Sequence, residues 1–346
     1  MKLGSLMAST QLEFESRLDG CHTAALERTV RFGQRRRELE GILPSGSITI
    51  DAAMGVGGLP RGRMIELFGP PAIGKTTLGL QAVAAVQGEG ETAALVDAER
   101  AFDDAYAARV GVNLDGLLLV RTDDGQQAFR IIERLAASKA VDLIVVDSVA
   151  ALLPPEEREA ALGEAGSFVQ CEMLASGLRR LGRVLQGSPA CVLFLNQVRA
   201  YKGFGYAQTS VGGWALKLHA AVRADLQERG EWVEGKRVEL RVVKNQLSKP
   251  LQTEFDFTAG VGVAREAELV DRGLASGVLR AGPSGIAFEG HVIGRNRRET
   301  LERLAIHVTL AAQLRTEVRT ALGLPQRRPV GREMQEAAVT CSAVNG

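Results

Sequence analysis

The stretch MIELFGPPAIGKTT, at residues 64–77, decides the fold. The segment MIELF predicts a buried β-strand, and residues 69–76 then match the pattern G-x-x-x-x-G-K-[ST]. A helical stretch follows, from residue 76 to about residue 87. Glycines in such a loop let backbone N–H groups point at phosphate oxygens, and the positive end of the helix dipole faces the same anion. We predict a phosphate-binding loop, because a chance glycine-rich turn would lack the flanking strand and helix.

The end of this loop carries the side chains that a nucleotide with Mg²⁺ requires. The ammonium of Lys75 would reach the β- and γ-phosphates, and the hydroxyl of Thr76 would ligate the metal. The predicted ATP-binding residues of the loop are Gly69, Pro70, Pro71, Ala72, Ile73, Gly74, Lys75, Thr76 and Thr77. The two prolines are unusual here, because proline has no N–H to donate.

The chain around the loop alternates between short apolar strands and helices. We expect further strands at residues 92–96, 117–120, 143–146 and 192–195. Between residues 125 and 138 the apolar residues recur at helical spacing, and so do the leucines of residues 174–185. Apolar strands separated by helices predict an α/β fold, with a parallel sheet covered on both faces. Farther on, residues 237–242 alternate charged and apolar, which predicts a half-exposed antiparallel strand.

Two acidic residues follow predicted strands. Asp147 ends LIVVD, where a carboxylate beside a phosphate-binding loop could hold the Mg²⁺ shell. Glu99 lies in LVDAERAFDDAYA (residues 95–107), just past a strand end, where it could orient the attacking water. Composition alone favours another interpretation, in which Asp97, Glu99 and Asp103 are surface charges that open a helix.

Composition is that of a soluble globular protein. Of 346 residues, 45% are hydrophobic and 24% are charged, and the net charge is +1, so any nucleic-acid surface must be local. The four cysteines are widely spaced, and we expect free thiols in a reducing compartment. Because no apolar run has the length of a membrane span and no signal-peptide core is present, we expect a cytoplasmic protein with no membrane partner.

Six motifs occur in an order and at spacings that resemble the bacterial RecA recombinase family: GPPAIGKTT, LVDAERAFD, VDLIVVDSVAAL, FLNQVR, GGWALK and VVKNQ. The likeness runs from about residue 43 to residue 322. It implies a RecA-type P-loop NTPase core with a twisted, mostly parallel sheet. It also implies a DNA-dependent ATPase that forms helical filaments of itself on single-stranded DNA, pairs that strand with a double-stranded DNA and exchanges strands. Such filaments also activate the self-cleavage of a repressor in the SOS response.

The resemblance assigns roles around the nucleotide. Glu99 would activate water, and Asp103 and Tyr106 would lie by the adenine, where a tyrosine ring offers a stacking face. Gln197 resembles the family's γ-phosphate sensor, whose amide loses its bond on hydrolysis. Lys244 matches a lysine that reaches the neighbouring subunit's ATP. The implied catalytic residues are Glu99, Lys75, Gln197 and Lys244, and the implied metal ligands are Thr76 and Asp147.

The resemblance places DNA at two loops, about residues 156–168 and 198–211. The second loop mixes cations and aromatic residues among glycines, which suits single-stranded DNA, although a surface loop with no ligand could have the same composition. The implied DNA-binding residues are Arg179, Arg199, Lys202, Phe204, Gly212 and Gly213. A basic cluster at residues 295–298 could guide duplex DNA, with a solvated loop as the alternative.

We expect four segments along the chain. Residues 1–40 would be a short helical N-terminal oligomerisation segment, with a solvated lead-in as the alternative. Residues 41–264 would form the ATPase core, residues 265–324 a small C-terminal α/β domain, and residues 325–346 a flexible tail.

Several positions depart from the family pattern. Gln246 stands where a second cross-interface lysine is expected, Glu172 where a basic residue is usual, and Trp214 where asparagine is typical. Ala259 replaces an aromatic residue, and the tail is not acidic. These changes leave two alternatives open: an ATP-gated accessory repair factor without strand exchange, and a ring-forming motor of the same fold.

Overall fold

The computed structural model describes residues 41–159, 167–203, 205–232 and 235–326. Its centre is a large sheet with strand order β12-β11-β10-β9-β3-β7-β6-β4-β5, and β8 pairs with β7. The strands are β3 (Met64–Gly69), β4 (Ala93–Asp97), β5 (Leu117–Arg121), β6 (Leu143–Asp147), β7 (Cys191–Gly203), β8 (Gly205–Ser210), β9 (Val222–Trp232), β10 (Gly235–Asn245), β11 (Gln252–Thr258) and β12 (Gly262–Val263).

The path from β9 to β5 is parallel throughout, whereas β9, β10, β11 and β12 pair antiparallel. The predicted mostly parallel sheet is therefore confirmed, and so is the antiparallel strand at residues 237–242. Neighbouring residues of β6 point to opposite cores: Leu143 and Val145 join one hydrophobic cluster, and Ile144 and Val146 join the other. This alternation explains why the strands are continuously apolar, since both faces are covered.

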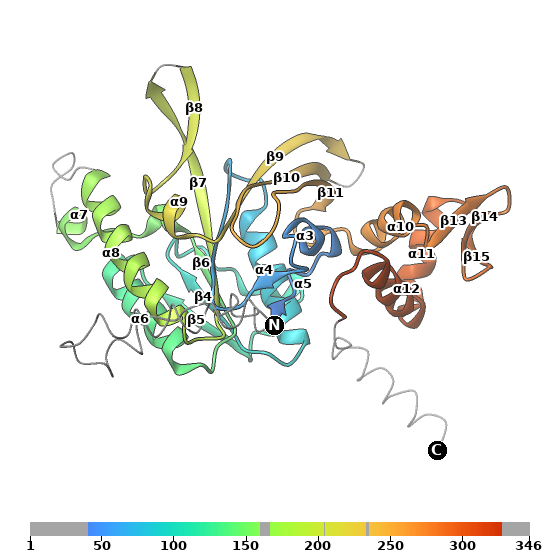
Figure 1. The fold of residues 1–346 in the computed structure, drawn as a ribbon, viewed down its shortest axis with the longest axis horizontal. Coiled ribbons are helices and arrows are strands. Elements are labelled where there is room, and N and C mark those ends of the chain that lie inside the picture. Colours follow the sequence, from blue (N-terminus) through green and yellow to red (C-terminus); the bar gives the residue numbers. More distant parts are fainter. Residues whose placement is uncertain (1–40, 160–166, 204, 233–234, 327–346) are drawn as a thin grey trace, which may run out of the picture. The chain divides into compact units, whose positions relative to one another are not determined.

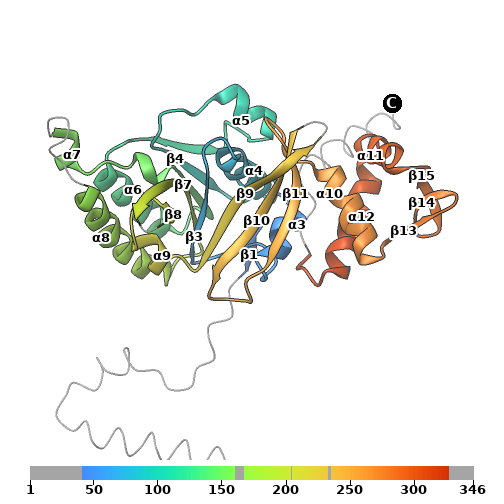
Figure 2. The same ribbon diagram turned by 90° about the horizontal axis from the view of Figure 1, so that it is seen from above.

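Helices cover both faces of this sheet (Figures 1 and 2). The first cluster contains residues of α4 (Lys75–Gly88) and α5 (Asp104–Val110). The second contains residues of α6 (Gly125–Ser138), α8 (Ser167–Leu185) and α9 (Ala215–His219). The helices predicted at residues 76–87, 125–138 and 174–185 are confirmed within these bounds.

A third hydrophobic cluster lies in the C-terminal part. Its elements are α10 (Arg265–Ser276), α11 (Arg297–Ile306) and α12 (Val308–Ala321), with an antiparallel sheet of β13 (Leu279–Gly282), β14 (Gly285–Phe288) and β15 (His291–Gly294). Ile48 also belongs to this cluster, although it comes from the other end of the described chain. The mixture of helix and strand agrees with the expected α/β character.

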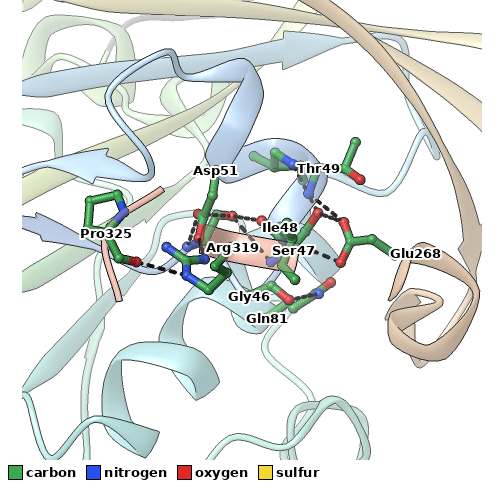
Figure 3. Close-up of polar contacts among 11 residues, drawn as sticks. Gly46, Ser47, Ile48, Thr49, Asp51, Gln81, Glu268, Arg319 and Pro325 are labelled. Carbon is green, nitrogen blue, oxygen red and sulfur yellow. Dashed lines mark hydrogen bonds and ion pairs between the residues drawn. The ribbon is translucent and has the colours of Figure 1, made fainter. Parts of the chain in front are cut away.

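Ile48 is the first residue of α3 (Ile48–Ala53), whose amino end is capped from a distance (Figure 3). The carboxylate of Glu268, on α10, accepts hydrogen bonds from the N–H groups of Ile48 at 3.0 Å and Thr49 at 2.7 Å. It also accepts one from the hydroxyl of Ser47. The first N–H groups of a helix have no partner within the helix, so Glu268 satisfies donors that would otherwise be buried unpaired.

A buried ion pair makes a second link between α3 and the C-terminal part. Arg319 of α12 donates to Asp51 of α3 at 2.9 Å, and the two side chains are only 4% and 3% exposed. The other carboxylate oxygen of Asp51 accepts bonds from the N–H and hydroxyl of Ser45 at 3.0 and 2.7 Å. Gln81, on α4, donates to the carbonyl of Gly46 at 2.9 Å and accepts from the N–H of Val263 at 3.0 Å.

Two local expectations, both about the DNA loops, were wrong. Residues 198–211 form most of a β-hairpin rather than a loop, because β7 and β8 pair in register from Val198–Ser210 to Gly203–Gly205 (Figure 1). The first expected DNA loop contains a short helix, α7 (Pro155–Glu159), and α8 already begins at Ser167. Pro325 and Gln326, expected in the tail, are tied to α12. The predicted N-terminal segment and the rest of the tail lie outside the described residues.

Candidate nucleotide-binding and catalytic site

The phosphate-binding loop connects β3 to α4 at the carboxyl end of the parallel strands. Gly74, the residue before α4, has φ 109°, and a Cβ atom there would lie 2.3 Å from Cζ of Phe257. Both the positive φ and the lack of space for a Cβ atom favour glycine at this position. Lys75 curls back over the loop, donating to the carbonyls of Gly69 at 3.0 Å and Pro70 at 2.7 Å. Burial lowers the pKa of Lys75, and the negative charge of Asp147 opposes that shift.

Thr76 and Asp147, the two predicted metal ligands, lie within hydrogen-bonding distance of each other. The hydroxyl of Thr76 donates to a carboxylate oxygen of Asp147 at 2.6 Å. Burial raises the pKa of Asp147 to about 6, and the nearby charges of Glu99 and Asp97 add to the rise. A cation would relieve this unfavourable burial of charge. The oxygen pair fits Mg²⁺, which uses one or two protein oxygens and takes the rest from phosphates and water. No cluster of three or more His, Cys, Asp or Glu that could hold a metal occurs among the described residues.

Glu99 extends from the turn after β4. It is held by one donor on β7 and one directly after β6. The amide of Gln197 donates to its Oε1 at 3.1 Å, and the hydroxyl of Ser148 donates to the same oxygen. Asp97 fixes the turn itself, because its carboxylate accepts from the N–H groups of Ala101 and Phe102 at 3.1 and 3.2 Å. Asp97 is therefore buried within the structure, not a surface charge.

Gln197 also connects the nucleotide side of β7 to the start of the segment with Gly212 and Gly213. Its carbonyl accepts from the N–H of Val211 at 3.1 Å. The preceding residue, Asn196, is fully buried and donates to Glu66 at 2.8 Å and to the carbonyl of Val211 at 2.9 Å. Glu66 is in turn paired with Arg223. The bonds of Gln197 and Asn196 to Val211 therefore tie β7 to the chain that follows β8.

Tyr106 and Asp103 lie at the start of α5. Asp103 is the N-cap of that helix and accepts from the N–H of Tyr106 at 2.9 Å. The Tyr106 hydroxyl is hydrogen-bonded to the hydroxyl of Thr77 at 2.5 Å and accepts from the N–H of Gly260 at 3.1 Å. The tyrosine is thus linked to the first turn of α4. The capping role of Asp103 agrees with the alternative in which it opens a helix, and its contact with adenine stays a prediction.

Lys244 lies apart from this cluster. Its ammonium donates to the carbonyls of Lys217 at 2.8 Å and Leu218 at 2.9 Å. Burial lowers the pKa of Lys244, and the positive charge of Arg223 lowers it further. These bonds lie within one chain, so the contact of Lys244 with a neighbouring subunit remains a prediction. The side chain of Gln246 is exposed, and the effect of this departure from the family also remains a prediction.

The predicted DNA residues are only partly brought together. Arg179 on α8 and Arg199 on β7 are exposed. Gly212 and Gly213 have φ values of 89° and 63°, in the left-handed region that favours glycine. The side chains of Lys202 and Phe204 lie outside the described residues. In the basic cluster, Arg295, Arg297 and Arg298 pair with Glu299, Asp271 and Glu302, so carboxylates offset much of its charge.

Sequence reasoning missed three residues at this site. Ser148 bonds Glu99, and its place directly after Asp147 was a signal that could have identified it. Lys236 reaches the phosphate-binding loop from β10 and donates to the carbonyl of Ala72 at 2.5 Å. Phe257, from β11, packs against Gly74. No local pattern marks the last two, because they come from the antiparallel strands.

Comparison with known proteins agrees with this geometry. Residues 25–264 match the model of the RecA N-terminal domain family. The chain is 39% identical to Protein RecA of Streptomyces avermitilis over 324 residues, which cover 91% of this chain and 86% of that protein. It is 41% identical to Protein RecA 1 of Myxococcus xanthus, covering 85% of this chain and 88% of that protein. It is also 41% identical to Protein RecA of Bordetella petrii, covering 86% of each chain.

These relatives support the recombinase interpretation over the accessory-factor and ring-motor alternatives. No helix among the described residues is long and apolar enough to span a membrane. The matches extend well beyond the phosphate-binding loop and include the strands that hold Glu99, Asp147 and Gln197. The chain belongs to the RecA family, the ATP-dependent DNA recombinases.

Proposed function

We propose that this chain hydrolyses ATP within a filament on single-stranded DNA and promotes homologous pairing and strand exchange in DNA repair. The observation that carries the proposal is the convergence of Lys75, the Thr76–Asp147 pair and the Glu99–Gln197 pair at adjacent strand ends. These are the groups that phosphoryl transfer requires: a phosphate-binding cation, metal ligands, a base for water and a polar contact to the transferred group.

Each residue has a distinct part in the proposed reaction. ATP supplies the phosphoanhydride bond that is cleaved, and a bound Mg²⁺ would offset the phosphate charge. Lys75 binds phosphate oxygens, and Thr76 with Asp147 holds the metal. Glu99 orients the attacking water and accepts its proton, and Ser148 holds the carboxylate in place. Tyr106 would border the adenine. Lys244 would act on the ATP of a neighbouring protomer, which makes hydrolysis depend on assembly.

The proposed coupling to DNA runs through Gln197. Its amide bonds Glu99, and its carbonyl bonds Val211, directly before Gly212 and Gly213. Loss of the γ-phosphate would change the environment of the amide and bias the position of the DNA-binding segment. Arg179, Arg199 and Lys202 would contact phosphates, Phe204 would contact bases, and the two glycines would offer backbone N–H groups. The same filament would bind duplex DNA and activate the self-cleavage of a repressor.

Replacing Lys75 with Ala is expected to weaken ATP binding by about 10- to 100-fold, because a charge-assisted contact to phosphate is lost. Titration with a fluorescent ATP analogue measures this directly. Lys249→Ala, at an exposed lysine, is the matched control and should bind as the parent does. An unchanged affinity in Lys75→Ala would refute the assignment of the phosphate site.

The ATPase rate should rise when single-stranded DNA is added, and this stimulation should weaken as salt increases. Contacts to phosphates release counterions, so the logarithm of the binding constant falls with the logarithm of salt concentration, by about 0.7 for each phosphate neutralised. Phosphate release measured with and without an oligonucleotide, at several salt concentrations, tests this. A rate indifferent to DNA at every salt concentration would contradict the proposed recombinase activity.

A further inference from the structure

Trp214 has an unusual environment for a tryptophan. It directly follows Gly213 and precedes α9, and 72% of its surface is exposed. A single exposed apolar side chain is common on protein surfaces, so the groups around this indole decide what it can bind. The ammonium of Lys217 lies 5.0 Å from the centroid of the ring. One ring face is therefore next to a cation.

The backbone beneath the indole is held tightly against α8. A Cβ atom on Gly212 would lie 2.6 Å from Cδ1 of Leu174, and one on Gly213 would lie 3.2 Å from Sγ of Cys171. Ala215, the next residue along, is buried. The main chain thus fits closely against the helix while the large side chain points away from it. The backbone that carries the indole therefore has little room to move toward α8.

Lys217 is the cation at the ring, and further positive side chains lie toward the carboxyl end of α9. Lys217 is fixed by a hydrogen bond to Thr209, at the base of the hairpin, at 2.7 Å. Lys244 binds the carbonyls of residues 217 and 218. Burial lowers the pKa of His219, and the positive charges of Arg179 and Lys244 lower it further. Glu172, one residue beyond Cys171 on α8, is an exposed carboxylate that opposes these charges in part. Leu218, one turn after Trp214, is also exposed, so the surface is mixed. The cation at the ring is the feature that favours an anionic ligand with an aromatic part.

We propose that Trp214 is a stacking platform for a nucleobase of bound single-stranded DNA, with Lys217 holding the adjacent phosphate. This role rests on the proposed function. Stacking on an aromatic side chain is tolerant of sequence, because every base has a π-face. The bond from the N–H of Val211 to the carbonyl of Gln197 places the platform three residues from a segment anchored at the nucleotide site.

Intrinsic fluorescence tests the contact directly, because the chain has only two tryptophans. In the full chain with Trp232→Phe, emission from Trp214 should be quenched by oligo(dT). An oligonucleotide of the same length with abasic sites has the same phosphates without bases, and it should cause little quenching. Equal quenching by both would overturn the stacking assignment. Quenching that depends on protein concentration without DNA would also overturn it, because a second copy would then cover the indole.

Affinity measurements distinguish stacking on an aromatic ring from contact with any large apolar side chain. Trp214→Phe keeps a ring and should bind oligo(dT) within about threefold of the parent, whereas Trp214→Leu should bind roughly tenfold more weakly. The salt dependence of binding should be unchanged in Trp214→Leu and shallower in Lys217→Met, because only the second loses a phosphate contact. Ile306→Ala, at another exposed apolar residue, is the control.

The possible failures are distinguishable. If Trp214→Leu binds DNA as the parent does, the platform is refuted and the recombinase function stands. If the parent chain itself does not bind DNA, the proposed function is refuted, and the platform that rests on it is refuted as well.

Discussion

Glu99→Gln is expected to lower the kcat for ATP hydrolysis by about 10²- to 10⁴-fold, the usual contribution of a positioned general base. Glutamine has the same shape and can still accept hydrogen bonds from Ser148 and Gln197, so the local structure should persist. It cannot take a proton from water. Nucleotide affinity should remain within about threefold of the parent, because Glu99 does not hold phosphate in the proposed site.

Single-turnover phosphate release measures the chemical step, and titration with a fluorescent nucleotide measures binding. Glu302→Gln, on the surface of α11, is the matched control, and it should hydrolyse ATP at the parent rate. A kcat for Glu99→Gln close to that of the parent would show that another group activates water. A joint loss of binding and rate would instead show that Glu99 maintains the fold of the site.

Arg319→Met should lower the free energy of unfolding by about 3 to 5 kcal/mol, because it leaves the carboxylate of Asp51 buried without its cation. Both side chains are almost inaccessible to water, so neither is screened by solvent. The double variant Asp51→Asn with Arg319→Met removes both charges while the asparagine can still accept from Ser45. Its destabilisation should be clearly less than the sum of the two single effects.

Urea unfolding followed by circular dichroism gives these free energies. Arg298→Met is the control on the same part of the chain, because it breaks an exposed ion pair with Glu302, whose loss should cost less than about 1 kcal/mol. Additive effects of Asp51 and Arg319 would mean that the two side chains do not depend on each other.

Much of the central fold could be predicted because its signals are local. The apolar strand before Gly69, the loop that ends at Thr76 and the strand that ends at Asp147 each carry their own pattern over a few residues. The ends of the strands also predict where the site lies, because parallel strands bring their carboxyl ends to the same edge of the sheet. That rule places Glu99 and Asp147 together, and Gln197, which the resemblance to the family assigns, bonds Glu99 at the same edge.

What could not be predicted depends on long-range contacts. Glu268 caps α3 across some 220 residues of sequence, and a glutamate within a helix gives no sign of such a partner. Lys236 lies on an antiparallel strand and reaches the phosphate-binding loop only because β10 is positioned by β9 and β11. The sequence predicts a loop where β7 and β8 form a hairpin, because its glycines and charges do not alternate with apolar residues as they do in a strand that packs against a core.

The cap on α3 limits how far the protein can be divided. A fragment that ends near residue 264 would keep every strand of the large sheet and the whole nucleotide site. It would nevertheless lose the acceptor for the first amides of α3 and the cation that neutralises Asp51. The C-terminal part is therefore not a detachable module. Exchanging it between relatives would require the residues that contact α3 to be transferred with it.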